Sequence, residues 1–315
     1  MNKRQKAFLQ FTIEEEKIIL ADLKKIYEQA AKDIDLKIAA LLARKDAENL
    51  QSIIYQVDYQ RALKQQIGAI LDELNTKQFE SISKYLTECY ENGFLGVLYD
   101  LQGQGIPLIF PINQEEVVRA IVHDTKLSKR LYTSLGEDVG ELKKRIRAEL
   151  SRGISQAYTY EKMAKNIRNQ TSIGFNKSMR IVRTEGHRIT QEATFDAQHK
   201  AKDAGADIVK QWDSTLDGRT RELHSELDGQ IRELDEPFTV GAYSGQYPSG
   251  FGAPEMDINC RCVLLQRARS ALGGKGNYTK FDGNKGHLVN LSDVDNFSDF
   301  KQRVKRITAK DKGQA

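Results

Sequence analysis

No proline occurs before Pro107, and up to that point apolar side chains recur at the spacing of an α-helix. Because proline removes a backbone donor and clashes with the preceding turn, its absence lets helices form without interruption. Apolar stripes predict helices over residues 18–31, 53–71 and 77–99, and Asp35 is the expected N-cap of one more. These stripes are typical of core packing in an elongated helical bundle, although one of them could instead dock a partner helix.

The helical pattern stops at Gly103, and the segment 106–111, with a proline near each end, is expected to be extended and to act as a hinge. A weakly signalled interruption of the helical pattern is predicted over residues 133–137. A last short helix is expected to begin at Ser292. Between these points, helices are expected over residues 113–122, 137–152, 159–169 and 176–205.

The most distinctive stretch runs from Trp212 to Cys262. It holds the only tryptophan, three of the five prolines and two of the three cysteines. Asp217 is a plausible N-cap for a short helix over residues 220–227, and Gly229 is expected to end that helix. Strands are expected over residues 207–212 and 261–266, where Val and Leu are frequent.

Three side chains of this stretch form a candidate metal site, with zinc as the candidate metal. Alternation along the second strand would place Cys260 and Cys262 on one face, about 6.6 Å apart along the chain. His224 would complete the set, with Asp217 or Asp228 as a fourth ligand. The C-x-C spacing is weaker evidence than paired C-x-x-C spacings. A Cys260–Cys262 disulfide is disfavoured, because neighbours on one strand face lie near the upper geometric limit.

The alternative to a metal is a small apolar core. The two thiols would then pack as apolar groups, and His224 would cap a neighbouring carbonyl. The loop that precedes the cysteines would be held by aromatic rings packed onto Trp212, namely Phe238, Tyr243, Tyr247 and Phe251. The sequence leaves both interpretations open.

Motifs of common enzymes are missing from the sequence. It contains no G-x-S-x-G, H-E-x-x-H or phosphate-binding glycine loop. Two enzymatic alternatives remain: a cysteine nucleophile with His224 as its base, and a metal-dependent nuclease that uses Asp217, Asp228 and His224. His187 and His199 are expected to be solvated positions on one long helix.

Charge is mildly positive overall, with a net charge of +4. Two local excesses stand out, in residues 143–168 and at the C-terminal end from residue 301. Such basic stretches neutralise phosphate without reading sequence, although a solvated helix face explains them equally well. The candidate DNA-binding residues are Lys143, Lys144, Arg145, Arg147, Arg152, Lys301, Arg303, Lys305 and Arg306.

Three cysteines, two of them clustered, do not form a disulfide framework, so a reducing compartment is expected. No signal peptide or transmembrane segment is recognised in the sequence. These observations predict a protein that is cytoplasmic where it is made.

The run W-x-S-T-x-D-x-R-T-R-x-x-H-x-x-L-D-G from Trp212, followed by Phe238, a Pro/Gly loop and N-C-R-C, resembles the Mu F-like minor head proteins of tailed phages. The family is also called the head morphogenesis proteins. An upstream R-T-E triplet matches its preceding helix, and residues 142–168 resemble its helical lead-in. The resemblance covers roughly residues 115–265. The motif residues are Arg183, Glu185, Trp212, Asp217, Arg219, His224, Gly229 and Asn259.

The resemblance implies a structural role rather than catalysis. Such a protein would be held inside the head by the portal protein, bind double-stranded DNA without sequence preference, and be delivered with the genome. Scaffold or capsid proteins and self-association are further expected contacts. The expected location is the virion, with the host cytoplasm during assembly. The enzymatic alternative is a metal-dependent nuclease or a toxin-like module, although the residues after Cys262 are too few for a typical fused toxin.

The expected fold class is α+β and mostly α, with an elongated helical half followed by a small compact domain. Arg183 and Glu185 would either form a surface ion pair or reach back to cap the Trp212–Cys262 stretch. The expected divisions are a helical assembly region over 1–105, a helical connector over 106–175, a Mu F-like domain over 176–268 and a flexible region with a basic tail over 269–315.

Overall fold

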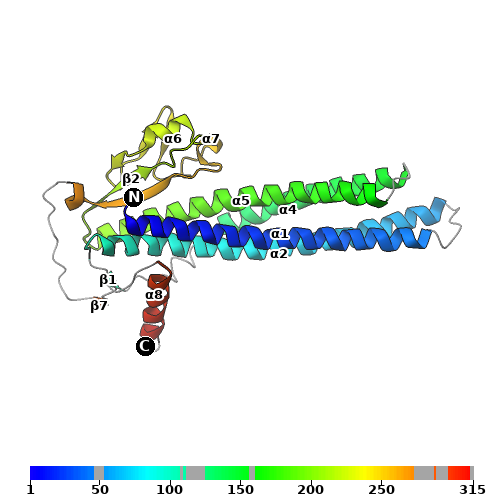
Figure 1. The fold of residues 1–315 in the computed structure, drawn as a ribbon, viewed down its shortest axis with the longest axis horizontal. Coiled ribbons are helices and arrows are strands. Elements are labelled where there is room, and N and C mark those ends of the chain that lie inside the picture. The colour runs from blue at the N-terminus through cyan, green and yellow to red at the C-terminus, as the bar shows by residue number, and fades with distance from the viewer. Residues whose placement is uncertain are drawn as a thin grey trace. The chain divides into compact units, whose positions relative to one another are not determined.

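The computed structural model describes residues 1–45, 53–106, 109–110, 125–155, 160–272, 287–288 and 297–312. Long helices dominate these residues, and short antiparallel strands gather in the C-terminal part (Figure 1). The expected mostly helical α+β class is therefore confirmed. None of the helices in the described ranges combines the length and the apolar character needed to cross a membrane.

Four long helices account for most of the described chain: α1 (Lys3–Lys45), α2 (Ile53–Gly103), α4 (Thr125–Ser155) and α5 (Tyr160–Asp203). The sequence analysis predicted further helix ends inside these spans, and those predictions are wrong. Asp35 is no N-cap, since it lies inside α1 and accepts a hydrogen bond of 2.9 Å from Arg168.

The other predicted breaks, between residues 71 and 77, over 133–137 and between 169 and 176, also lie inside continuous helices. Packing overrides weak local stop signals, because buried apolar side chains lie close to these positions, such as Leu74, Val139 and Ile167. The expected helix over 113–122 lies outside the described residues.

The contacts divide the chain into two compact units. The first unit comprises Met1–Glu16, Tyr85–Ile121 and Val182–Ala315, and the second comprises Lys17–Lys84 and Val122–Ile181. Each unit therefore draws on distant parts of the sequence, and α1, α2 and α5 each contribute residues to both.

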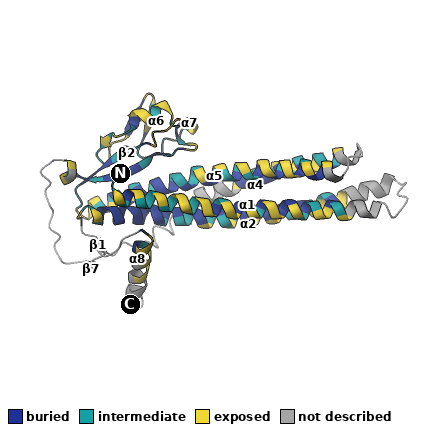
Figure 2. Cartoon of the chain, viewed as in Figure 1, coloured by how far each residue is buried: buried dark blue, intermediate teal, exposed yellow. Residues whose placement is uncertain are grey.

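The second unit is a helical bundle whose helices lie side by side (Figure 1). Buried positions recur along one face of each helix (Figure 2), as the apolar stripes predicted. One polar contact lies within this core: Gln78 Oε1 accepts hydrogen bonds from the hydroxyls of Tyr27 and Ser178 at 2.8 and 2.9 Å. The core residues include Ile34, Ile38, Leu63, Ile67, Leu71, Leu142, Ile146, Leu150 and Ile167.

The first unit contains the sheets. In the larger sheet, β2 (Ile208–Asp213) lies between β3 (Ile231–Arg232) and β6 (Val263–Ala268), and both neighbours are antiparallel to it. A second small sheet pairs β4 (Phe238–Val240) with β5 (Tyr243–Gly245). The two strands predicted from the sequence are thus present, although β6 begins later than expected.

Short elements complete the first unit. They are β1 (Ile109–Phe110), α6 (Glu222–Leu227), α7 (Pro254–Asp257), the 3-10 helix η1 (Arg269–Leu272), β7 (His287–Leu288) and α8 (Phe297–Lys312). The two residues of β1 pair with β7, so this part of the hinge segment is extended as predicted. Phe297 of α8 is buried, and its ring centroid lies 4.9 Å from that of Phe8. Ser292, the expected start of the last helix, lies outside the described residues.

A buried carboxylate connects the N-terminus to the larger sheet. Asp100 is 1% exposed and accepts hydrogen bonds from the side-chain amides of Gln5, Gln104 and Gln266. Gln266 belongs to β6, which fixes the start of α1 and the end of α2 beside that strand. These three bonds reach Oδ2, and Asn2 Nδ2 donates to Oδ1 at 2.5 Å, so both oxygens of this buried side chain are hydrogen-bonded.

Candidate metal centre

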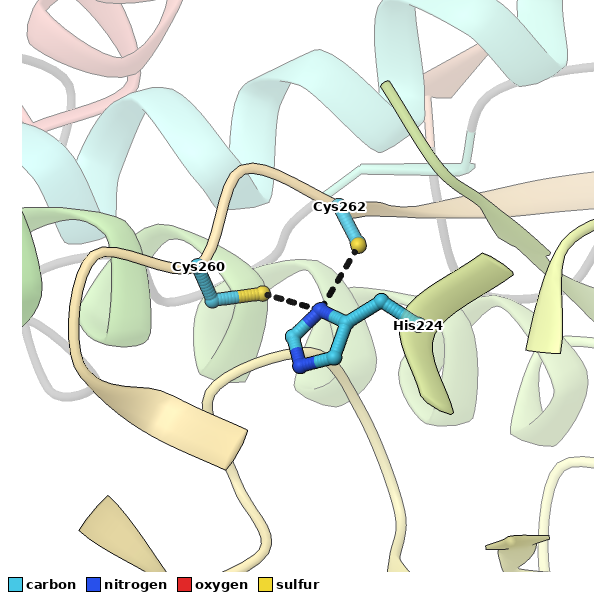
Figure 3. Close-up of side chains that lie close together, drawn as sticks. All are labelled: His224, Cys260 and Cys262. Carbon is cyan, nitrogen blue, oxygen red and sulfur yellow. Dashed lines mark hydrogen bonds between the residues drawn. The ribbon is translucent and has the colours of Figure 1, made fainter. Parts of the chain in front are cut away.

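Three metal-ligating side chains meet in the first unit (Figure 3). His224 Nδ1 lies 3.2 Å from Cys262 Sγ and 3.6 Å from Cys260 Sγ, and the three ligand atoms all lie within 4.8 Å of one another. All three residues are buried, with exposures of 3%, 5% and 2% for His224, Cys260 and Cys262. Neither cysteine forms a disulfide. The three candidate ligands named from the sequence therefore lie together in the structure.

The local structure around the three residues differs from the expected one. Cys260 and Cys262 precede β6 instead of belonging to it, because the strand begins at Val263. Asn259, immediately before them, has a φ of 54°, a left-handed conformation that asparagine tolerates better than most residues. The two thiols therefore converge through a turn, which explains why both sulfurs face one imidazole.

His224 is positioned by the short helix α6. Asp217 is not the N-cap of this helix, which is a correction: the N-cap is Arg221, without a side-chain hydrogen bond. The predicted C-terminal signal is confirmed, since Gly229 has a φ of 75° and its amide donates to the carbonyl of Trp212. That bond closes the connection between β2 and α6, so His224 faces the cysteines.

Two serine hydroxyls surround the cysteines. Ser214 Oγ donates to the carbonyl of His224 at 2.6 Å and lies 3.4 Å from Cys262 Sγ, while it accepts from Trp212 Nε1 at 2.9 Å. The hydroxyl of Ser249, which is 1% exposed, forms a hydrogen bond with Cys260. Each sulfur therefore has a polar neighbour of its own, which a purely apolar packing of two thiols would not require.

The two thiols have opposite acidities. The Cys260 thiol donates to the Cys262 sulfur, and this bond, helped by His224 and Ser214, lowers the pKa of Cys262 despite its burial. The same bond, together with burial, raises the pKa of Cys260. The pair therefore favours one thiolate, which is the form that binds metals. His224 Nε2 is buried and has no hydrogen-bond partner among the described residues.

The expected fourth ligands have other partners. Both carboxylate oxygens of Asp217 accept from the guanidinium of Arg261 at 2.6 Å, and Oδ1 also accepts from the amide of Arg219 at 2.9 Å. The Arg261 contact holds the pKa of Asp217 well below its usual range. Asp228 Oδ1 accepts from the amide of Ser214 at 2.7 Å. The cluster found among the described residues includes neither aspartate.

Helix α5 contacts the site through residues that the sequence did not indicate. His187 Nε2 donates to the carbonyl of Cys262 at 2.8 Å, and Gln191 Oε1 accepts from the amide of Leu264 at 2.7 Å. Thr184 Oγ1 accepts from the amide of Asn259 at 3.3 Å. These residues are spaced by three and four positions, so they share one face of the helix. That spacing is the feature of the sequence from which the contact could have been predicted.

The expectation that His187 is solvated is therefore wrong. Burial lowers the pKa of His187, and the hydrogen bond to the Cys262 carbonyl opposes this shift. Arg183 and Glu185 neither form an ion pair with each other nor cap the Trp212–Cys262 stretch. Arg183 pairs with Glu16 at 3.0 Å, and Glu185 pairs with Arg188 at 3.0 Å.

Aromatic packing adjoins the cluster. Trp212 is fully buried, and its ring centroid lies 5.3 Å from that of Phe238, 5.7 Å from that of Phe251 and 6.1 Å from that of His224. Tyr243 and Tyr247 pack against the same core as partly buried residues. The aromatic contacts expected under the packing alternative are therefore present, and they coexist with the converging ligands.

Many of the candidate DNA-binding residues are engaged by acidic side chains. Lys143 pairs with Asp72, Arg145 with Glu141, and Arg152 with Glu149. At the C-terminal end, Lys301 and Lys305 both approach Glu91, at 3.8 and 3.0 Å. Lys144, Arg147 and Arg306 are exposed, while the Arg303 side chain lies outside the described residues. The free basic surface is therefore smaller than the sequence suggests.

Comparison with known proteins finds a family match over part of the chain. The family model described as Phage Mu protein F like protein matches residues 144–265, which include the whole Trp212–Cys262 stretch. This part of the chain is a Mu F-like region. The resemblance drawn from the sequence motif is thereby confirmed.

Two curated relatives extend the match beyond that region. Minor head protein GP7 of Bacillus phage SPP1 is 28% identical over 254 residues, which are 79% of this chain and 77% of that protein. The NAD(+)--arginine ADP-ribosyltransferase EFV of Enterococcus faecalis (strain ATCC 700802 / V583) is 30% identical over 243 residues, 76% of this chain. The chain spans only 50% of that second protein. No solved structure matches the chain significantly.

Proposed function

We propose that this Mu F-like chain is a structural minor head protein that joins the phage head together with the portal protein and contacts the packaged DNA without reading its sequence. The observation that carries this proposal is the similarity to the minor head protein of phage SPP1, which extends over most of both chains. Delivery of the chain with the genome is part of the same proposal.

The arrangement of the cluster supports a structural role over a catalytic one. A catalytic nucleophile must be reached by its substrate, whereas Cys260, Cys262 and His224 are all at most 5% exposed. Asp217, which a nuclease would need for a metal, is instead held by Arg261. The named activity of the Enterococcus relative belongs to a protein of which this chain spans half, so it does not favour an enzyme here.

Portal association is tested with the full-length chain. Each compact unit contains segments from both ends of the sequence, so fragments cut near residue 130 would divide both units. Co-expression with the portal protein of the same phage, followed by purification of the portal ring, is expected to retain the chain. The major capsid protein, expressed alone with the chain, is the control. Equal retention by both proteins, or none by the portal, would refute the association.

DNA contact is expected to depend on the exposed residues of α4. Lys144 and Arg147 lie one turn apart on this helix and are both exposed. Each phosphate that such a residue neutralises contributes about −0.9 to the slope of log affinity against log salt. Replacing both by glutamine should therefore weaken duplex binding and flatten the slope by about 2.

The matched control is the double variant Lys24→Gln and Lys25→Gln, which removes two exposed charges from α1. Gel shifts at increasing salt compare the two variants with the wild type on one duplex. If both variants weaken binding equally, only net charge matters, and the assignment of the contact to α4 fails.

A further inference from the structure

We infer that His224, Cys260 and Cys262 bind a structural zinc ion, which joins α6 to the segment that precedes β6. The ion would be held by three protein ligands, with the fourth position taken by a water molecule. Asp217 is not among the ligands. This inference is independent of portal and DNA binding, since it concerns how one part of the first unit is held together.

The distances fit a tetrahedral zinc ion. With Zn–N near ~2.05 Å and Zn–S near ~2.3 Å, tetrahedral angles place nitrogen and sulfur ligands about 3.6 Å apart. The corresponding distances here are 3.2 and 3.6 Å from His224 Nδ1 to the sulfurs of Cys262 and Cys260. The two nitrogen–sulfur distances therefore differ from those of a tetrahedral zinc site by at most a few tenths of an ångström, and all three ligand atoms lie within 4.8 Å of one another.

The charges also balance. Two thiolates and one divalent cation sum to zero, so a buried site formed by Cys260, Cys262 and a neutral His224 carries no net charge. The imidazole faces both sulfurs through Nδ1, while Nε2 has no hydrogen-bond partner among the described residues, so the ring is oriented by the cysteine side and not by a second hydrogen bond.

The surrounding residues suit a metal site as well. The hydroxyls of Ser214 and Ser249 lie beside the two sulfurs and donate to the carbonyls of His224 and Asp257, so they link the sulfurs to the backbone on either side of the site. The site also closes a long connection. His224 and Cys260 lie 36 positions apart, and the strands and helices between them are all short, with at most four residues each. A shared ion would fix both ends of that connection.

The wild-type chain provides the first test. It is purified without a histidine tag, loaded with zinc, and desalted before elemental analysis. We expect about one zinc ion per chain, and a cobalt-loaded sample should show a thiolate-to-metal charge-transfer band. A strong chelator should lower the melting temperature, because metal binding is coupled to folding. Less than about a tenth of an ion per chain after loading, with a melting temperature unaffected by chelator, would overturn the inference.

Variants then test which residues bind. Cys260→Ser, Cys262→Ser and His224→Ala should each lose the ion and the effect of chelator on melting. The matched control is Cys89→Ser, which alters a buried cysteine of the same unit that is hydrogen-bonded to Tyr85 and Thr190. This control should keep the ion even where it lowers the melting temperature.

Asp217→Asn should also keep the ion, because the aspartate is held by Arg261. Loss of the ion in Cys89→Ser would show that binding follows overall stability and not these ligands. Loss of the ion in Asp217→Asn would contradict the three-residue assignment.

Discussion

Phe238 offers the sharpest test of how the Trp212–Cys262 stretch is stabilised. Its side chain is fully buried, its ring lies edge-on to that of Trp212 at 5.3 Å, and the ammonium group of Lys210 lies 5.2 Å from its centroid. Truncation of a buried phenylalanine to alanine costs about 3–5 kcal/mol, because it removes apolar burial and leaves a cavity. The contact with Trp212 contributes about 0.5–1.5 kcal/mol beyond burial, so the upper half of the range is expected.

The measurement uses the only tryptophan of the chain, Trp212, as its probe. Its fluorescence reports unfolding of this stretch during a urea titration, so other parts of the protein do not obscure the result. Phe238→Ala should lower the urea midpoint by an amount that corresponds to about 4–5 kcal/mol, with the slope unchanged.

Phe251→Ala is the matched control, because its ring also packs edge-on to Trp212, at 5.7 Å, but is only partly buried. A partly buried ring removes less apolar surface from water, so about half the loss is expected. The reasoning fails if Phe251→Ala costs as much as Phe238→Ala, or if Phe238→Ala costs less than about 1 kcal/mol.

Two further predictions concern a buried lysine and two glycines. Burial lowers the pKa of Lys210 to about 8, below the unfolded value of about 10.4, so the unfolded state binds more protons between these values and stability should increase with pH there. Lys210→Met should abolish that increase. The urea midpoints of variant and wild type are compared from pH 7.5 to pH 10. If the midpoint of the variant rises with pH as steeply as that of the wild type, the increase does not come from Lys210. A Cβ at Gly93 would overlap the backbone of Thr190, so Gly93→Ala should destabilise by about 1–3 kcal/mol, whereas Gly140→Ala, in open space on α4, should stabilise by about 0.5–1 kcal/mol. Thermal melts of both glycine variants test this pair, and equal shifts would refute it.

The helices show where sequence reasoning reaches its limit. Periodicity placed Tyr27, Ile67 and Leu71 on apolar stripes, and all three are core residues, although Ile18 of the first stripe is exposed. It failed at the breaks, because a residue such as Asp35 signals a cap only if the chain actually turns there. In α1 the apolar stripe continues past Asp35, and the aspartate finds a partner in Arg168, 133 residues away. Such a partner cannot be inferred from local sequence.

The candidate site shows the same limit. The clustering of His224 with Cys260 and Cys262 could be predicted because these residue types share chemistry and lie in one stretch. The ion pair that Asp217 forms could not be predicted in the same way. Its partner is Arg261, and the position of Arg261 depends on how the turn before β6 folds. The contact from His187 was missed because nothing in the sequence states which face of α5 meets the site.

The most direct test of the proposed role is to locate the chain in purified phage heads. Quantitative mass spectrometry of intact heads treated with protease, compared with heads opened before treatment, distinguishes an internal protein from a surface or contaminating one. We expect the chain to be present in intact heads, protected from protease, and digested once the heads are opened. Heads that lack the chain, or that lose it to protease while intact, would contradict the proposed function.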